Sequence, residues 1–259
     1  MLEQNASGVD SHDPRVKLGR LVLVVALLLA MERPEFGSAQ PPANVVTSGS
    51  SQAESAPTVL QEADDQKPLV WTSEDPAQDK KWEFKDSAGW KFVDSGGERV
   101  LSQFLKSSDY QPPHRSPLHI ALLKDHKFES FQMDAWVKST HAEYGHRDVC
   151  LFFGYAAPDK FYYVHMASEM DDRANQIFLV NQADRVKISV TTTTGTRWED
   201  RWHQVRLTRD AKTGEVAVFF DDMNQPVMTA VDKTIGPGQI GFGSFDDTVD
   251  FKRLEIRVR

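Results

Sequence analysis

Two segments of the chain, 131–138 and 146–168, carry residue types suited to contacting a sugar. In both segments apolar and polar side chains alternate, which is the pattern of a β-strand with one face buried. If the two segments lie side by side in one sheet, their polar faces join into a single surface. That surface would hold Asp134, Trp136, Lys138, Asp148, Phe152, Tyr163 and His165. Aromatic rings cover the apolar C–H faces of sugars while polar groups match their hydroxyls, so we predict a carbohydrate site.

The same surface suggests a catalytic set. Glycoside hydrolysis uses two carboxyl groups, about 5 Å apart for retention of configuration and roughly 6.5–9.5 Å apart for inversion. Asp134 and Asp148 on neighbouring strands would meet that spacing, and His165 would transfer protons because its pKa lies nearest neutrality. The alternative is that the polar and aromatic side chains of this face pack beneath a covering loop.

Two loop-to-strand borders supply further candidates, His114 with Arg115 and His146 with Arg147. A guanidinium offers a rigid fork of donors to a carboxylate or a vicinal diol. We therefore add His146 and Arg147 to the predicted ligand-binding residues. A structural ion pair between Arg147 and an Asp is the competing interpretation.

The elements that must position these residues are short strands. Residues 146–168 form a predicted hairpin whose turn contains Pro158 and Asp159. Phe131, Met133, Ala135 and Val137 form the predicted core face of 131–138. Further predicted strands are 82–84, 90–93, 100–104, 119–123, 176–181, 186–191, 203–209, 215–221, 227–231, 238–245 and 250–258. This series predicts an all-β fold, an antiparallel sandwich of two sheets.

Acid pairs in predicted turns raise the possibility of a metal. Calcium binds six to eight oxygen ligands, which loop carboxylates and carbonyls supply. We predict a structural calcium near Asp246 and Asp250, with turn capping as the alternative. The eight His residues lack zinc-ligand spacing. The single Cys, Cys150, has no partner for an intramolecular disulfide and fits a small buried side chain.

Composition and the N-terminus restrict location and partners. The formal net charge of −8 argues against a nucleic-acid partner. Basic residues precede the apolar run 21–31, and small residues follow up to Ala39, which is the order of a secretory signal peptide. The run is too short for a stable membrane span. We predict a signal peptide at 1–39, a disordered linker at 40–70 and one domain at 71–259, in a secreted or periplasmic protein.

The order of motifs resembles a known fold family. FFGY and DKFYYVH in the hairpin are followed by QIFLVN, WHQVRL, GEVAVFFDD and a closing GQIGFGSFDDTVDFKRLEIRV. This series is similar to the concanavalin A-like lectin/glucanase jelly rolls, and in particular to secreted bacterial 3-keto-disaccharide hydrolase-like domains. The resemblance covers nearly all of residues 80–259. The ending also resembles laminarinase-type glycosidases, whose catalytic Glu-x-Asp-x-x-Glu motif is absent here.

The resemblance implies a jelly roll that serves binding and hydrolysis in different members, because fold does not fix function. Three functions follow as hypotheses. The first is a glycan-binding domain for an oligo- or polysaccharide. The second is a glycoside hydrolase of the 3-keto-disaccharide hydrolase-like group, and the third is a protein-interaction domain of the cell envelope.

Overall fold

The computed structural model describes residues 67–259. The predicted signal peptide, 1–39, and most of the predicted linker, 40–70, lie outside the described residues. The boundary of the domain differs from the prediction by two residues. Leu69 and Val70, assigned to the linker, belong to strand β1 (Leu69–Thr72), where they pair with Ile256 and Glu255. The cross-strand pairing and the burial of Trp71 explain why the ordered domain begins earlier.

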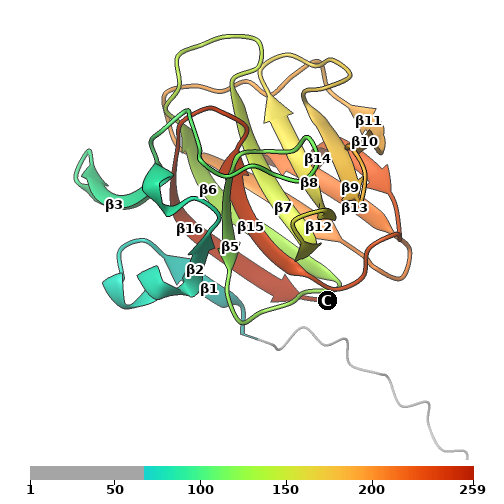
Figure 1. The fold of residues 1–259 in the computed structure, drawn as a ribbon, viewed down its shortest axis with the longest axis horizontal. Helices are drawn as coiled ribbons and strands as arrows, with labels where there is room; N and C mark the ends of the chain where they lie inside the picture. Colours follow the sequence, from blue (N-terminus) through green and yellow to red (C-terminus); the bar gives the residue numbers. More distant parts are fainter. Residues whose placement is uncertain (1–66) are drawn as a thin grey trace, which may run out of the picture. The chain divides into compact units, whose positions relative to one another are not determined.

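Residues 67–259 form two antiparallel sheets, confirming the predicted all-β sandwich (Figure 1). We call the sheets of nine and seven strands in this part of the chain the large and the small sheet. The large sheet contains β1, β3 (Trp90–Ser95), β4 (Glu98–Gln103), β6 (Phe131–Ser139), β11 (Ser189–Thr192), β12 (His203–Arg209), β13 (Glu215–Phe220), β14 (Asp222–Val231) and β16 (Val249–Val258). The small sheet contains β2 (Trp82–Phe84), β5 (His119–Leu123), β7 (Asp148–Ala157), β8 (Lys160–Ala167), β9 (Gln176–Asn181), β10 (Val186–Lys187) and β15 (Gln239–Ser244).

Short 3-10 helices, η1 (Pro76–Lys81) and η2 (Ser87–Gly89), connect the first strands. Both begin after an aspartate, Asp75 or Asp86, whose carboxylate accepts a hydrogen bond from a backbone N–H of the first turn. No helix within residues 67–259 has the length and apolar character needed to cross a membrane.

The predicted hairpin is strands β7 and β8. Ala157 pairs with Lys160 across the two-residue turn of Pro158 and Asp159. The register shifts between Phe153 and Ala157, a stretch that includes Gly154 at φ +58°, so the strand bulges there. One face of the hairpin lies wholly in the main hydrophobic core, through the side chains of Val149, Leu151, Phe153, Tyr162, Val164 and Met166.

Strand β6 does not neighbour this hairpin. It lies in the large sheet between β12 and β16, whereas β7 and β8 lie in the small sheet beside β15 and β9. Since the Met133 face of β6 is core, its polar face points away from the sandwich on the side opposite Asp148. The predicted single surface is therefore wrong. Alternation shows which residues share a face of one strand, but it does not show which sheet the strand joins.

The polar face of the hairpin is itself largely covered. A second hydrophobic cluster lies there, with Tyr110 and Phe245 packed against it. Its members are Ile120, Leu122, Cys150, Phe152, Tyr155, Phe161, Tyr163, Phe178 and Val180. Phe152 and Tyr163 are fully buried in this cluster, so their predicted role in stacking on a ligand is wrong. The alternative of packing beneath a covering loop holds for these two rings, and Cys150 is buried as expected.

Phe242 of β15 joins the two sheets at the centre of the core. Its ring stacks on Phe251 of β16 at 3.9 Å between centroids and lies 4.4 Å from Trp82. We expect Phe242→Ala to lower the free energy of unfolding by about 3–5 kcal/mol, because it removes buried surface and leaves a cavity. Urea unfolding measures the change. Val190→Ala, at a side chain that is 68% exposed, is the control and should change stability by less than about 0.5 kcal/mol. An effect of similar size in both variants would contradict this assignment.

Candidate functional site

A pocket of about 240 Å³ opens on the outer side of the small sheet, where β7 begins and β8 ends. Its side chains come from five loops and two strands, so it depends on the whole small sheet for its shape. The lining residues are Arg115, Tyr144, His146, Asp148, His165, Arg173, Arg185, Phe245 and Asp246. We refer to this hollow as the Asp148 pocket.

Asp148 and His165 line this pocket although both side chains are nearly inaccessible to solvent. Atom Oδ2 of Asp148 accepts a hydrogen bond from the backbone N–H of Phe245 at 3.0 Å, and another from the Cys150 thiol at 3.2 Å. Atom Oδ1 of Asp148 has no hydrogen-bond partner. A buried acceptor without a partner is costly, since it has lost water and gained nothing in exchange.

One ring nitrogen of His165 is hydrogen-bonded and the other is not. Its Nδ1 lies 2.8 Å from the carbonyl oxygen of Arg173, which can only accept, so Nδ1 carries a proton and donates. Its Nε2 lies 3.4 Å from Asp148 Oδ2 and has no hydrogen-bond partner. The pocket therefore presents two buried polar atoms without a partner, Asp148 Oδ1 and His165 Nε2, which an incoming hydroxyl would satisfy.

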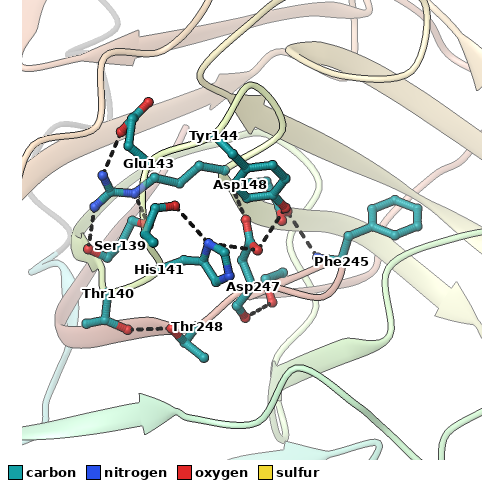
Figure 2. A network of polar contacts seen from close by, with 12 residues as sticks. Ser139, Thr140, His141, Glu143, Tyr144, Asp148, Phe245, Asp247 and Thr248 are labelled. Carbon is teal, nitrogen blue, oxygen red and sulfur yellow. Dashed lines mark hydrogen bonds and ion pairs between the residues drawn. The ribbon is translucent and has the colours of Figure 1, made fainter.

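Hydrogen bonds to the Asp247 carboxylate hold Asp148 in position (Figure 2). Asp247 accepts hydrogen bonds from the Tyr144 hydroxyl at 2.8 Å and from the backbone N–H of Asp148 at 2.7 Å. His141 Nδ1 lies 3.5 Å from the same carboxylate. Burial, together with the charge of Asp148, raises the pKa of Asp247 to about 6. Burial and the hydrogen bond to Asp247 also raise the pKa of Tyr144.

Three arginines also line the pocket: Arg115, Arg173 and Arg185. Arg185 donates to the Tyr163 hydroxyl at 2.7 Å, and its guanidinium lies 4.8 Å from the centre of the Phe245 ring. Arg115 lies 5.7 Å from the same ring. His146 Nε2 is 2.9 Å from Asp171 at the rim. The pocket therefore combines the carboxylates of Asp148 and Asp246 with guanidinium donors.

Five residues singled out from sequence meet in this pocket: Arg115, His146, Asp148, His165 and Asp246. The predicted catalytic partner Asp134 does not, because it lies on the large sheet. Its carboxylate is held by Arg206 Nε at 2.8 Å and by Gln204 Nε2 at 2.9 Å. The predicted pairing of Asp134 with Asp148 is therefore wrong.

Arg147 is a structural residue. Its buried guanidinium donates to Ser139, to Glu143 at 2.8 Å and to Asp200 at 3.3 Å, and none of these residues lines the pocket (Figure 2 includes the first two contacts). The ion-pair interpretation holds for this residue, although its partners are not the adjacent Asp148. The predicted ligand-binding role of Arg147 is wrong, since its guanidinium is buried away from the pocket and each of its three nitrogens already donates.

Trp136 and Lys138 lie on the outer face of the large sheet. Trp136 lines a separate hollow of about 380 Å³ with Arg99, Lys252 and Arg253. The charges in this hollow compensate one another: Lys252 pairs with Glu98 at 3.0 Å, and Arg253 pairs with Glu255. The Asp148 pocket differs because two of its buried polar atoms, Asp148 Oδ1 and His165 Nε2, have no partner, so it is the stronger candidate.

Sequence reasoning missed Tyr144, Arg173, Arg185 and Phe245. They lie in irregular loops that carry no periodic pattern, and only the fold brings them to the hairpin. A usable signal was the presence of several arginines in the loops around the hairpin: Arg115, Arg173 and Arg185.

Two groups in the described chain have metal-ligating atoms within 4.8 Å of one another, and Asp148 belongs to both. One adds Cys150 and His165; the other adds Asp246 and Asp247. The predicted pair of Asp246 with Asp250 does not form. Asp250 lies on strand β16 of the large sheet, and its carboxylate is 3.4 Å from Ser95 Oγ of strand β3. Calcium at Asp246 stays a prediction, with Asp148 and Asp247 as the neighbouring carboxylates.

Comparison with known proteins supports the fold. No protein-family model matches the chain, and no curated protein matches it. Among solved structures, the GH43 protein BlXynB from Bacillus licheniformis has a TM-score of 0.51 at 9% identity, covering 73% of this chain and 39% of that one. The chain thus spans well under half of that protein. This likeness confirms the expected jelly-roll class at the level of fold.

Two further matches have lower TM-scores. The carbohydrate-binding module CBM66 from Bacillus subtilis matches at 14% identity and a TM-score of 0.46, covering 66% of this chain and 91% of that one. Lectin I-B4 from Griffonia simplicifolia matches at 12% identity and a TM-score of 0.43, covering 73% and 98%.

The raised pKa of Asp247 predicts a pH-dependent contribution to stability. Between pH 4 and 6 the folded state keeps this proton while the unfolded chain, with a pKa near 3.8, releases it. The folded state is therefore favoured at the acidic end, and this contribution is lost as the pH rises through 6. Asp247→Asn cannot titrate, so the stability of the native protein relative to this variant should fall from pH 4 to 7. Urea unfolding across that range measures it. Parallel curves for the two proteins would contradict the assignment.

Proposed function

We propose that this protein binds carbohydrate and that the Asp148 pocket is its binding site. The observation that carries the proposal is the pair of unpartnered buried polar atoms, Asp148 Oδ1 and His165 Nε2, whose residues line one small pocket. Both atoms lack a hydrogen-bond partner, and a sugar hydroxyl, which donates and accepts, can supply one at either position.

The remaining walls suit a sugar as well. Phe245 is partly exposed and offers an apolar ring, while the guanidiniums of Arg115 and Arg185 offer donors. The volume of about 240 Å³ lies below the roughly 300–1,000 Å³ of sites for drug-sized ligands, which favours a single ring over a long chain segment. The occupant we infer is one sugar residue of an oligo- or polysaccharide.

Glycoside hydrolysis is the second candidate, and one observation favours it. Asp148 and Asp247 place two carboxyl groups together, and the pKa of Asp247 of about 6 suits an acid that works near neutrality. Both oxygens of Asp247, however, already accept hydrogen bonds from Tyr144 and from the Asp148 backbone. Carbohydrate binding is therefore the better-supported function. Glycoside hydrolysis of the 3-keto-disaccharide hydrolase-like kind is the second candidate.

The expected location accords with a glycan ligand. We propose that residues 1–39 direct export and that the domain acts outside the cytoplasm. The charged, apolar and small residue order of this segment supports the proposal.

N-terminal sequencing of the protein recovered from the periplasm or medium of an expressing bacterium would find a start at Gln40. Intact protein retained inside the cell would contradict it.

The site is tested with a glycan array, followed by calorimetric titration of the best ligand into the protein. We expect Asp148→Asn and His165→Gln each to weaken binding by roughly 10- to 100-fold, because each replaces an unpartnered buried polar atom that a hydroxyl would satisfy. Circular dichroism and a thermal melt establish that each variant is folded.

Trp136→Ala provides the comparison on the opposite face of the sandwich. We expect it to bind as tightly as the native protein. If Trp136→Ala abolishes binding while Asp148→Asn does not, the site lies on the large sheet. If no saccharide binds and a partner protein protects the Asp148 pocket from hydrogen exchange, the protein-interaction hypothesis replaces this proposal.

A further inference from the structure

We propose that the saccharide taken by the Asp148 pocket is anionic, with a carboxylate or sulfate group bound by Arg115, Arg173 and Arg185. This inference rests on the proposed function, since it specifies the chemistry of the ligand of the same pocket. It begins from the unusual state of these three arginines.

Most arginines in the described chain are paired with carboxylates. Among residues 67–259 the paired ones are Arg99, Arg147, Arg197, Arg201, Arg206, Arg253 and Arg257. Five arginines form no ion pair within that part of the chain: Arg115, Arg173, Arg185, Arg209 and Arg259. The first three line one pocket, where the carboxylates are those of Asp148 and Asp246. Three like charges that converge without forming an ion pair repel one another, so their convergence favours the binding of an anion.

Aromatic rings hold Arg185 in place of a carboxylate. Its guanidinium lies 4.6 Å from the Phe178 ring centre and 4.8 Å from that of Phe245. One Nη donates to the Tyr163 hydroxyl and the other lies 3.3 Å from the Arg173 carbonyl oxygen. Stacking fixes the plane of the guanidinium and leaves its charge uncancelled. A planar carboxylate is the natural partner for such an oriented fork of donors.

The positive wall continues beyond the pocket. A neighbouring hollow of about 430 Å³ shares Arg115, Arg173 and Arg185 and adds Phe178, Lys187, Asp172 and Asp184. Its two acids are partly engaged, because Asp172 pairs with Lys187 at 2.6 Å and Asp184 lies 3.7 Å from His114. The three arginines therefore line both hollows, in a position to bind a charged substituent of a sugar ring seated in the first one.

The carboxylates of the pocket set the orientation of the ligand. Asp148, His165 and Asp246 line only the first of these two hollows, whereas the three arginines line both. These carboxylates would repel an anion and accept from hydroxyls. A hexuronate has its carboxylate on one side of the ring and vicinal hydroxyls on the other, which matches this division. A sulfated sugar offers the same combination of charge and hydroxyls.

The test compares matched saccharides on the full protein. We would titrate oligosaccharides of hexuronates, their carboxyl-reduced neutral counterparts of identical linkage, and sulfated forms of those neutral sugars. We expect the hexuronates or the sulfated forms to bind at least tenfold more tightly than the neutral sugars, with affinity falling as salt rises. Preference for one of the two anionic classes identifies the source of the charge.

Substitutions separate a built site from general attraction. Arg185→Lys keeps the charge but loses the planar fork, and Arg173→Ala removes one donor. We expect both to reduce affinity for the anionic sugar by roughly tenfold or more, with little effect on a neutral sugar. Arg197→Ala is the charge-matched control, because it removes an arginine whose side chain is 90% exposed and lies outside the pocket. This control should bind like the native protein.

These experiments distinguish a failure of the anionic inference from a failure of the carbohydrate-binding proposal. Equal binding of neutral and anionic sugars, lost in Asp148→Asn, would overturn the anionic inference and leave the carbohydrate proposal standing. Equal losses in Arg197→Ala and Arg185→Lys would also overturn it, since the attraction would then be non-specific. Binding of no saccharide of any class would overturn both proposals.

Discussion

The burial of the Asp148 carboxylate is the constraint on which the candidate site depends. Its Oδ2 accepts from the backbone of Phe245, and its own backbone N–H donates to Asp247. These two bonds tie the loop between β15 and β16 to the first residue of β7. The loop carries Phe245 and Asp246 into the pocket, so the position of its wall follows from the carboxylate beneath it. One oxygen of the Asp148 carboxylate is hydrogen-bonded and fixes the loop, while the other has no partner and can accept a hydrogen bond from a ligand.

The fold was largely accessible from the sequence because alternation in strands is a local property. The bounds 82–84, 119–123, 176–181 and 203–209 coincide with β2, β5, β9 and β12. Strand β1 was missed because four residues beside a polar segment show no pattern, and its stability comes from pairing with β16. The assignment of β6 to the wrong neighbour has a similar cause. Pairing between distant strands depends on the packing of the whole sandwich, which one strand does not encode.

The site was accessible only where it lies on the hairpin. Asp148 and His165 stood out as polar residues among aromatics, and the structure places them together. The same reasoning selected Phe152 and Tyr163, which the covering loops bury. Whether a face of a sheet is open or covered is decided by loops far along the chain. Tyr110 and Phe245 cover most of this face, and the opening they leave is the pocket.

The second hydrophobic cluster also explains how an acidic protein can hold an arginine, Arg185, that forms no ion pair. On the large sheet, Arg206 and Arg253 are neutralised by Asp134 and Glu255. On the small sheet, the outer cluster presents Phe178 and Phe245 instead, and Arg185 stacks against both. A ring orients a guanidinium without supplying a counter-charge, so the charge stays available to a ligand. Tyr163, which the sequence suggested as a direct sugar contact, thus acts one step away, by accepting a hydrogen bond from Arg185, which lines the pocket.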